Sequence, residues 1–197
     1  MPTQDHPLRA ALEALEPLPT GAPLVRFARG HHLHVWFGVG PFDTGGWGSN
    51  PWGSWIVLPK AFREPAVMAR LENVLLIGHE LVHVMQNAAR GGRLPFPLYR
   101  EVEAHIVQQT LTWEAAPLAA NPAATAQAAA RNLVELTRDL ASGFAYVVAC
   151  GEGLKPLNYY RTPLFTSAGE GDPLATLAEL LEFPAFPDHV RAIVAGG

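Results

Sequence analysis

Residues 74–86 read VLLIGHELVHVMQ, and this stretch decides the fold that we expect. It is apolar almost all round, and such a helix belongs in a protein interior. Burying His79, Glu80 and His83 is costly unless something pairs with them. Because residues four apart lie on one face of a helix, the rings of His79 and His83 can both reach one tetrahedral zinc ion. The alternative is a metal-free histidine pair satisfied by neighbouring polar groups.

Glu80 lies one residue further round the same helix, where it can touch a water on the metal. Zinc lowers the pKa of such a water towards about 7. Glu80 then takes the proton as the water attacks a peptide carbonyl, and returns it to the leaving amine. The pattern therefore predicts a zinc-dependent peptidase with Glu80 as its general base and acid.

A catalytic zinc needs a third protein ligand, and the helix expected over about residues 99–116 offers three candidates. They are Glu101, Glu103 and His105. Glycines and prolines between residues 91 and 97 allow the chain to reverse, so this helix can pack antiparallel to the first. Glu101 and His105 share one face of it, and Glu103 projects from the other side of the expected core stripe.

The segments GHELVHVMQ at 78–86 and EVEA at 101–104, with the preceding strand WIVLP at 55–59, resemble the gluzincins. They are most similar to compact bacterial members with a His-Glu-Leu-x-His-Val-x-Gln helix and a Glu-x-Glu-Ala-Asp segment. The resemblance covers about residues 50–110. It implies a zincin-like α+β fold, a single Zn²⁺, a peptide or protein substrate, and Glu101 as the ligand that joins His79 and His83.

One position departs from this pattern, because His105 stands where such families usually have an aspartate that bonds a ligand histidine. Either Glu103 supplies that acid, or the hydrogen bonding around the metal differs. His105 as the third ligand stays open as well. If it were a fourth ligand it would close the site, and the chain would be a catalytically silent zincin-fold module for binding or delivery.

A donor for the developing oxyanion is also required. The candidates are Tyr159, Tyr160 and Arg161, in a segment expected to be irregular. The alternative for this cluster is a surface loop with packed aromatic side chains.

The expected organisation is one domain over residues 1–197, with a sheet and the active-site helix in 1–90 and a helical lobe in 91–197. Val102, Ile106 and Trp113 are expected to form the core stripe of the second site helix. The first expected element is a packing helix at 5–16 with Leu8, Leu12 and Leu15 on one face, followed by a break at Pro17, Pro19, Gly21 and Pro23. A strand at 24–38 with a turn at Gly30, a loop at 38–53 and a strand at 54–58 come next. Helices are expected at 65–90, with Pro65 in the first turn, at 99–116, at 121–150, with Asn121 as N-cap and Pro122 at the first helical position, from 172 and at 187–195.

Two further groups of side chains are open to interpretation. His31, His32 and His34 are interpreted as the exposed face of a strand and its lead-in, with a second metal site as the alternative. The tryptophans at 36, 47, 52 and 55 have two interpretations, which the sequence favours equally. Either they line a substrate cleft or they cap a small sheet.

Composition excludes several classes of protein. The formal charge of −4 and the absence of a basic run give no reason to expect a nucleic-acid partner. Cys150 is the single cysteine, which excludes an internal disulfide framework and a cysteine-rich zinc site. The N-terminus lacks a signal-peptide layout and no apolar stretch is long enough for a membrane span, so we expect a cytoplasmic protein.

Overall fold

The computed structural model describes residues 6–38, 46–50, 53–89, 98–138 and 140–150. The chain divides into two compact units, Met1–Gly92 and Arg93–Gly197. The subdivision expected at residue 90 lies close to the boundary between them.

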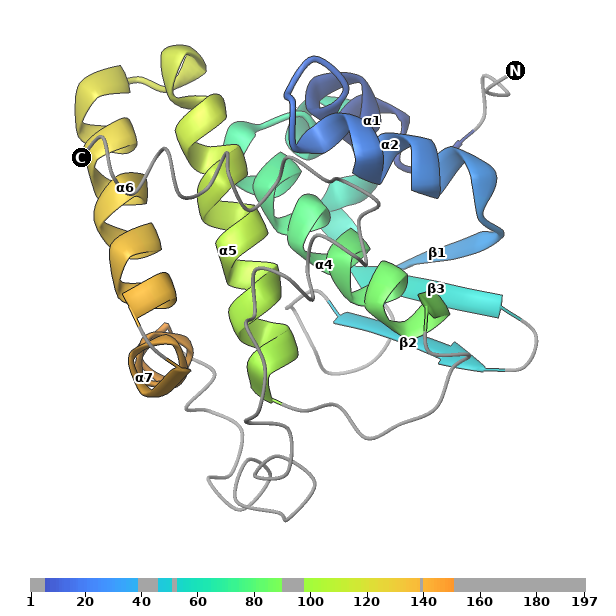
Figure 1. The fold of residues 1–197 in the computed structure, drawn as a ribbon. Coiled ribbons are helices and arrows are strands. Elements are labelled where there is room, and N and C mark those ends of the chain that lie inside the picture. Colours follow the sequence, from blue (N-terminus) through green and yellow to red (C-terminus); the bar gives the residue numbers. More distant parts are fainter. Residues whose placement is uncertain (1–5, 39–45, 51–52, 90–97, 139, 151–197) are drawn as a thin grey trace. The chain divides into compact units, whose positions relative to one another are not determined.

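The first unit begins with two helices, α1 at Arg9–Leu15 and α2 at Gly21–Gly30 (Figure 1). The leucines expected to be buried on the first helix are buried. The start of α2 lies so close to the end of α1 that a Cβ on Gly21 would stand 2.1 Å from the Leu15 carbonyl oxygen. Only glycine fits there, because any side chain would collide with backbone.

Helix α2 corrects the expectation of a strand over residues 24–38. Leu24, Val25 and Ala28 are buried, which is a helical stripe and not the alternation of a strand. Pro23 was read as a breaker, yet it lies in the first turn of α2, where its missing N–H costs no hydrogen bond. Within the predicted strand, the strand that forms covers residues 33–37.

The sheet has three strands in the order β1-β3-β2, namely β1 at Leu33–Phe37, β2 at Gly46–Asn50 and β3 at Gly53–Leu58. β1 runs parallel to β3, and β2 runs antiparallel to it. β3 confirms the strand predicted at 54–58. β2 falls inside the predicted loop, because glycine is depleted in strands and its presence there is a poor strand signal.

A single helix was expected over residues 65–90, but the chain forms α3 at Pro65–Met68 and α4 at Leu71–Ala89, after a short 3₁₀ turn η1 at Lys60–Arg63. Pro65 opens α3 as predicted. The Asn73 side-chain amide donates a 2.7 Å hydrogen bond to the Val67 carbonyl oxygen, which satisfies an acceptor left by the end of α3. α4 then packs against α1, α2, β2 and β3.

The second unit is helical in its described part, with α5 at Leu98–Glu114, a 3₁₀ turn η2 at Ala116–Leu118, α6 at Pro122–Arg138 and α7 at Leu140–Ala149. α5 and α6 lie side by side (Figure 1). Asn121 caps α6 as predicted, since its Oδ1 accepts a 3.2 Å hydrogen bond from the Ala124 N–H. The one long helix predicted for 121–150 is instead two helices.

The expected core stripe of α5 is partly wrong. Val102 and Ile106 are buried, but Trp113 is 37% exposed. Near the end of the helix the core is continued by Thr110 and Leu111, both buried.

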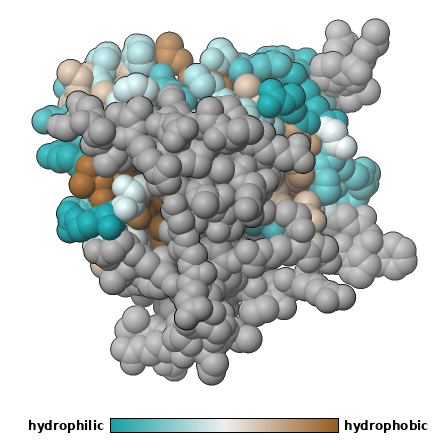
Figure 2. Space-filling view, in the orientation of Figure 1, coloured by the Kyte–Doolittle hydropathy of each residue, from teal (hydrophilic) through white to brown (hydrophobic). Residues whose placement is uncertain are grey.

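The described surface that Figure 2 shows is hydrophilic over much of its area. Large apolar side chains that are exposed among the described residues are Trp36, Trp113, Leu118 and Val134. No described helix has both the length and the apolar character needed to cross a membrane. The helices predicted from residue 172 and at 187–195 lie outside the described residues.

Candidate metal centre

The two histidines of α4 face one another, and both are buried. Their Nε2 atoms are 2.9 Å apart, their ring centroids are 4.6 Å apart, and their planes are nearly perpendicular at 83°. His79 is 7% exposed and His83 is 2% exposed. The helical spacing of four residues therefore brings both ring nitrogens to one point, as the sequence predicts.

This separation fits a shared metal ion. Two nitrogen ligands at 2.0–2.1 Å from a tetrahedral zinc are about 3.3 Å apart, so small ring rotations from 2.9 Å are sufficient. Two imidazole nitrogens at hydrogen-bonding distance must otherwise share a proton, because two lone pairs repel each other. A cation can replace that proton without moving the backbone.

Gln86 fixes the ring of His83. The amide oxygen of this buried glutamine lies 3.0 Å from His83 Nδ1. An amide oxygen only accepts hydrogen bonds, so Nδ1 carries the proton and the neutral ring keeps its lone pair on Nε2. Nε2 is thus available as a metal ligand, which is the arrangement that orienting partners of ligand histidines produce.

Sequence reasoning missed this role of Gln86. The available signal was its spacing of three residues from His83, which makes the two side chains neighbours on the helix surface.

Glu80 is also buried in α4, with 6% of its surface exposed. It lies three residues before His83, so the two are neighbours on the helix surface. The carboxylate of Glu80 therefore lies next to the histidine pair on the surface of α4.

The predicted third ligand belongs to the second unit. Glu101 is buried on α5 with 5% exposed, and Glu103 on the same helix is completely buried. His105 is half-buried and lies four residues after Glu101, on the same helical face. α5 thus carries two buried carboxylates and an imidazole within five residues, a costly set to bury without partners.

Helix α7 packs closely on this part of α5. A Cβ on Gly143 would lie 2.9 Å from Val102 Cγ1, so glycine allows the two helices to approach. One turn later, the ring of Tyr146 meets the ring of His105 edge to face, with centroids 5.7 Å apart. Burial raises the pKa of Tyr146, and a hydrogen bond with Cys150 raises it further.

Sequence reasoning also missed Tyr146. Its signal was an aromatic residue three positions after a glycine in an apolar helix. The oxyanion donors predicted from the sequence, Tyr159, Tyr160 and Arg161, lie outside the described residues.

The N-terminal histidines follow the interpretation as a strand and its lead-in. His32 and His34 are exposed. His31 Nε2 lies 3.2 Å from Ser54 Oγ, and its ring stacks on Phe27 with centroids 4.7 Å apart. In the described part of the first unit, no three His, Cys, Asp or Glu side chains bring their ligand atoms together.

Comparison with protein-family models, with curated proteins and with solved structures finds no match for this chain.

Proposed function

We propose that the protein is a zinc-dependent peptidase of the gluzincin type. One observation carries the proposal, namely the converging Nε2 atoms of His79 and His83, 2.9 Å apart in a buried helix. Gln86 holds His83 in the tautomer that a metal requires. Two imidazoles with an adjacent buried carboxylate are a donor set typical of catalytic zinc.

Glu101 completes the ligand set in this proposal. Its support is chemical, because a buried carboxylate on α5 needs a cation or strong hydrogen bonds to stay ionised. The peptide or protein substrate and the cytoplasmic location expected from the sequence also belong to the proposal and stay predictions.

A zinc ion held by these residues supplies Lewis-acid chemistry and makes water a nucleophile at neutral pH. The protein's part follows from its own side chains. Glu80 accepts a proton from the attacking water and passes it to the leaving amine. Gln86 keeps the His83 ring oriented, and the apolar environment of α4 limits access of bulk water to the reacting groups.

The decisive test is Glu80→Gln, which keeps the shape of the side chain but removes its basicity. We expect zinc content near one equivalent in both proteins, and cleavage of a mixed peptide library by the wild type alone. Glu72→Gln is the matched control, since Glu72 is an exposed glutamate in the first turn of the same helix. A Glu80→Gln protein that cleaves peptides as fast as the wild type would sink this mechanism.

The ligand assignment is tested separately. Glu101→Gln should lose zinc, whereas Glu103→Gln should keep it, with the histidine pair intact in both variants. If His105→Asn loses zinc and Glu101→Gln keeps it, His105 is the third ligand.

A catalytically silent module is the second candidate. It is favoured by His105, which shares a helical face with Glu101 and is supported by the ring of Tyr146. As a fourth ligand it would leave no position for water. X-ray absorption of the cobalt-substituted protein separates the candidates when it is combined with the variants: the silent module predicts three nitrogen ligands and a metal that needs both Glu101 and His105, whereas the peptidase predicts that only one of these two residues is needed.

A further inference from the structure

We propose that His32 and His34 form a second metal-binding site, on the outer face of the sheet, for a divalent transition-metal ion of the Cu²⁺ and Ni²⁺ class. This site is independent of the peptidase proposal and uses none of its residues.

The strand places both rings on one side. His32 immediately precedes β1 and His34 lies within it, and residues two apart in a strand point to the same face. Both side chains are exposed. β1 is an edge strand, so an ion can approach this pair from solvent. Among the described residues, neither ring makes a hydrogen bond within the protein, and the ring nitrogens are therefore available to an external ligand.

The ring geometry repeats that of the buried pair. The centroids of His32 and His34 are 4.5 Å apart with planes at 83°, against 4.6 Å and 83° for His79 and His83. Two imidazoles bound at about 2.0 Å with a right angle at the metal have centroids about 4.5 Å apart. Adjacent positions of a square-planar or tetragonal ion meet this condition, and Cu²⁺ and Ni²⁺ prefer that geometry.

His31 takes no part in this site. Its ring lies against the Ser54 hydroxyl and stacks on Phe27. The exposed pair therefore supplies two protein ligands, and water fills the other positions. Because a metal takes the neutral imidazole, its binding here weakens in acid.

The sheet contains a built-in reporter. Trp55 on β3 lies directly opposite His34 in the parallel register, and the ring of Trp36 stacks on that of Trp55 with centroids 6.2 Å apart. A paramagnetic Cu²⁺ bound to the pair quenches the fluorescence of these tryptophans because it is so close to them.

The experiment is a Cu²⁺ titration of the full chain and of its His32→Asn variant, in which the difference between the two titrations is assigned to this site. Tryptophan fluorescence and electron paramagnetic resonance are recorded together. We expect one saturable equivalent, quenched emission, and hyperfine coupling to two nitrogens. The proposal is overturned if no saturable equivalent appears.

Variants locate the bound ion. His34→Asn and His32→Asn should each lose the equivalent, and His31→Asn, the neighbouring control, should keep it. The double variant His32→Asn/Trp36→His restores two histidines two positions apart on the same face, and we expect the resonance signal to return. Retention of the equivalent in His34→Asn, or failure of the double variant to regain it while circular dichroism shows native folding, contradicts the site.

Discussion

Replacement of Gln86 by methionine tests the support of the buried histidine pair. The change keeps the length and volume of the side chain but removes the oxygen that lies 3.0 Å from His83 Nδ1. Removal of the acceptor from a buried donor costs about 1–3 kcal/mol. The ring can escape this cost by moving its proton to Nε2, but Nε2 is then blocked as a ligand.

Zinc affinity should therefore fall about 10- to 100-fold, the usual effect of losing an orienting partner, which corresponds to about 1.4–2.8 kcal/mol. Competition against a chromophoric chelator measures the dissociation constant directly. Urea unfolding of the metal-free protein reports separately on any loss of stability. Gln127→Met, at an exposed position of α6, is the control for the chemical change. A folded Gln86→Met protein that binds zinc as tightly as the wild type would refute the reasoning.

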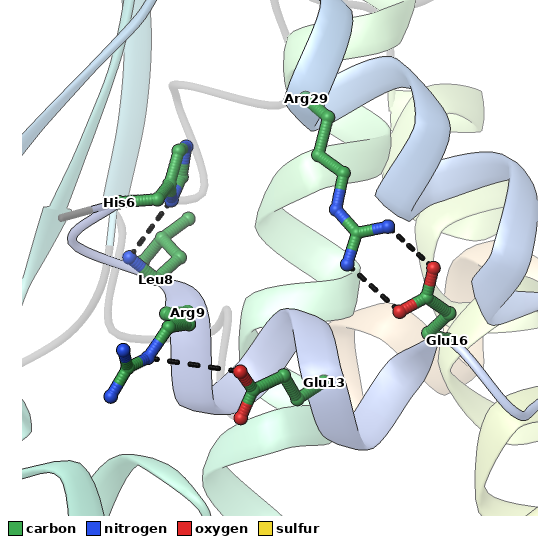
Figure 3. A network of polar contacts seen from close by, with 6 residues as sticks. All are labelled: His6, Leu8, Arg9, Glu13, Glu16 and Arg29. Atoms are coloured by element: carbon green, nitrogen blue, oxygen red, sulfur yellow. Dashed lines mark hydrogen bonds and ion pairs between the residues drawn. The ribbon is translucent and has the colours of Figure 1, made fainter. Parts of the chain in front are cut away.

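Three further changes test the fold. Gly143→Ala should lower the free energy of unfolding in urea. A Cβ 2.9 Å from Val102 Cγ1 overpacks the core at a cost of about 1–3 kcal/mol, which outweighs the gain in helix propensity of about 1 kcal/mol. A more stable variant would contradict the close packing of α7. The hydrogen bond from Arg29 lowers the pKa of Glu16 (Figure 3), so the pair stabilises the fold above the ordinary carboxyl pKa and loses this effect as pH falls through the lowered value. Wild type and Glu16→Gln should thus differ in melting temperature at pH 7 and converge as the pH falls through the lowered pKa; a difference that stays equal down to acid-induced unfolding would count against it. Asn121→Ala should cost about 1 kcal/mol in the same urea assay, and no change would mean that the cap is not formed in solution.

Sequence patterns predicted elements whose signals are local. The cap and the first-turn proline of α6, and the strand β3, follow from short-range chemistry that a few residues settle. α2 was missed because Pro23 was read as a breaker, although its effect depends on its position in the first turn. β2 was missed because its glycines carry little strand preference. It forms because it pairs with β3, which is a tertiary interaction.

In the candidate site, too, local relations could be predicted from the sequence and tertiary ones could not. His79, Glu80 and His83 could be predicted because one helical turn determines their relation. The role of Gln86 was equally local, but it became recognisable only when the 3.0 Å contact fixed the direction of its amide. Assignment of Glu101 depends on how two separate helices meet, and no local pattern specifies that.

The hydrogen bond from His83 to Gln86 also bears on the departure at His105. In the gluzincin pattern to which the proposed function assigns this chain, an aspartate four residues after the third ligand bonds a ligand histidine. Here His83 already has an orienting acceptor one turn along its own helix, so we infer that an acid at position 105 is not needed for that ring. An amide polarises the imidazole less than a carboxylate does, because charge-assisted hydrogen bonds are the stronger ones. Gln86→Glu should therefore tighten zinc binding, whereas His105→Asp should leave the affinity of the His83 site unchanged. Tighter binding in His105→Asp, measured in the same chelator competition, would show that position 105 still acts on the metal.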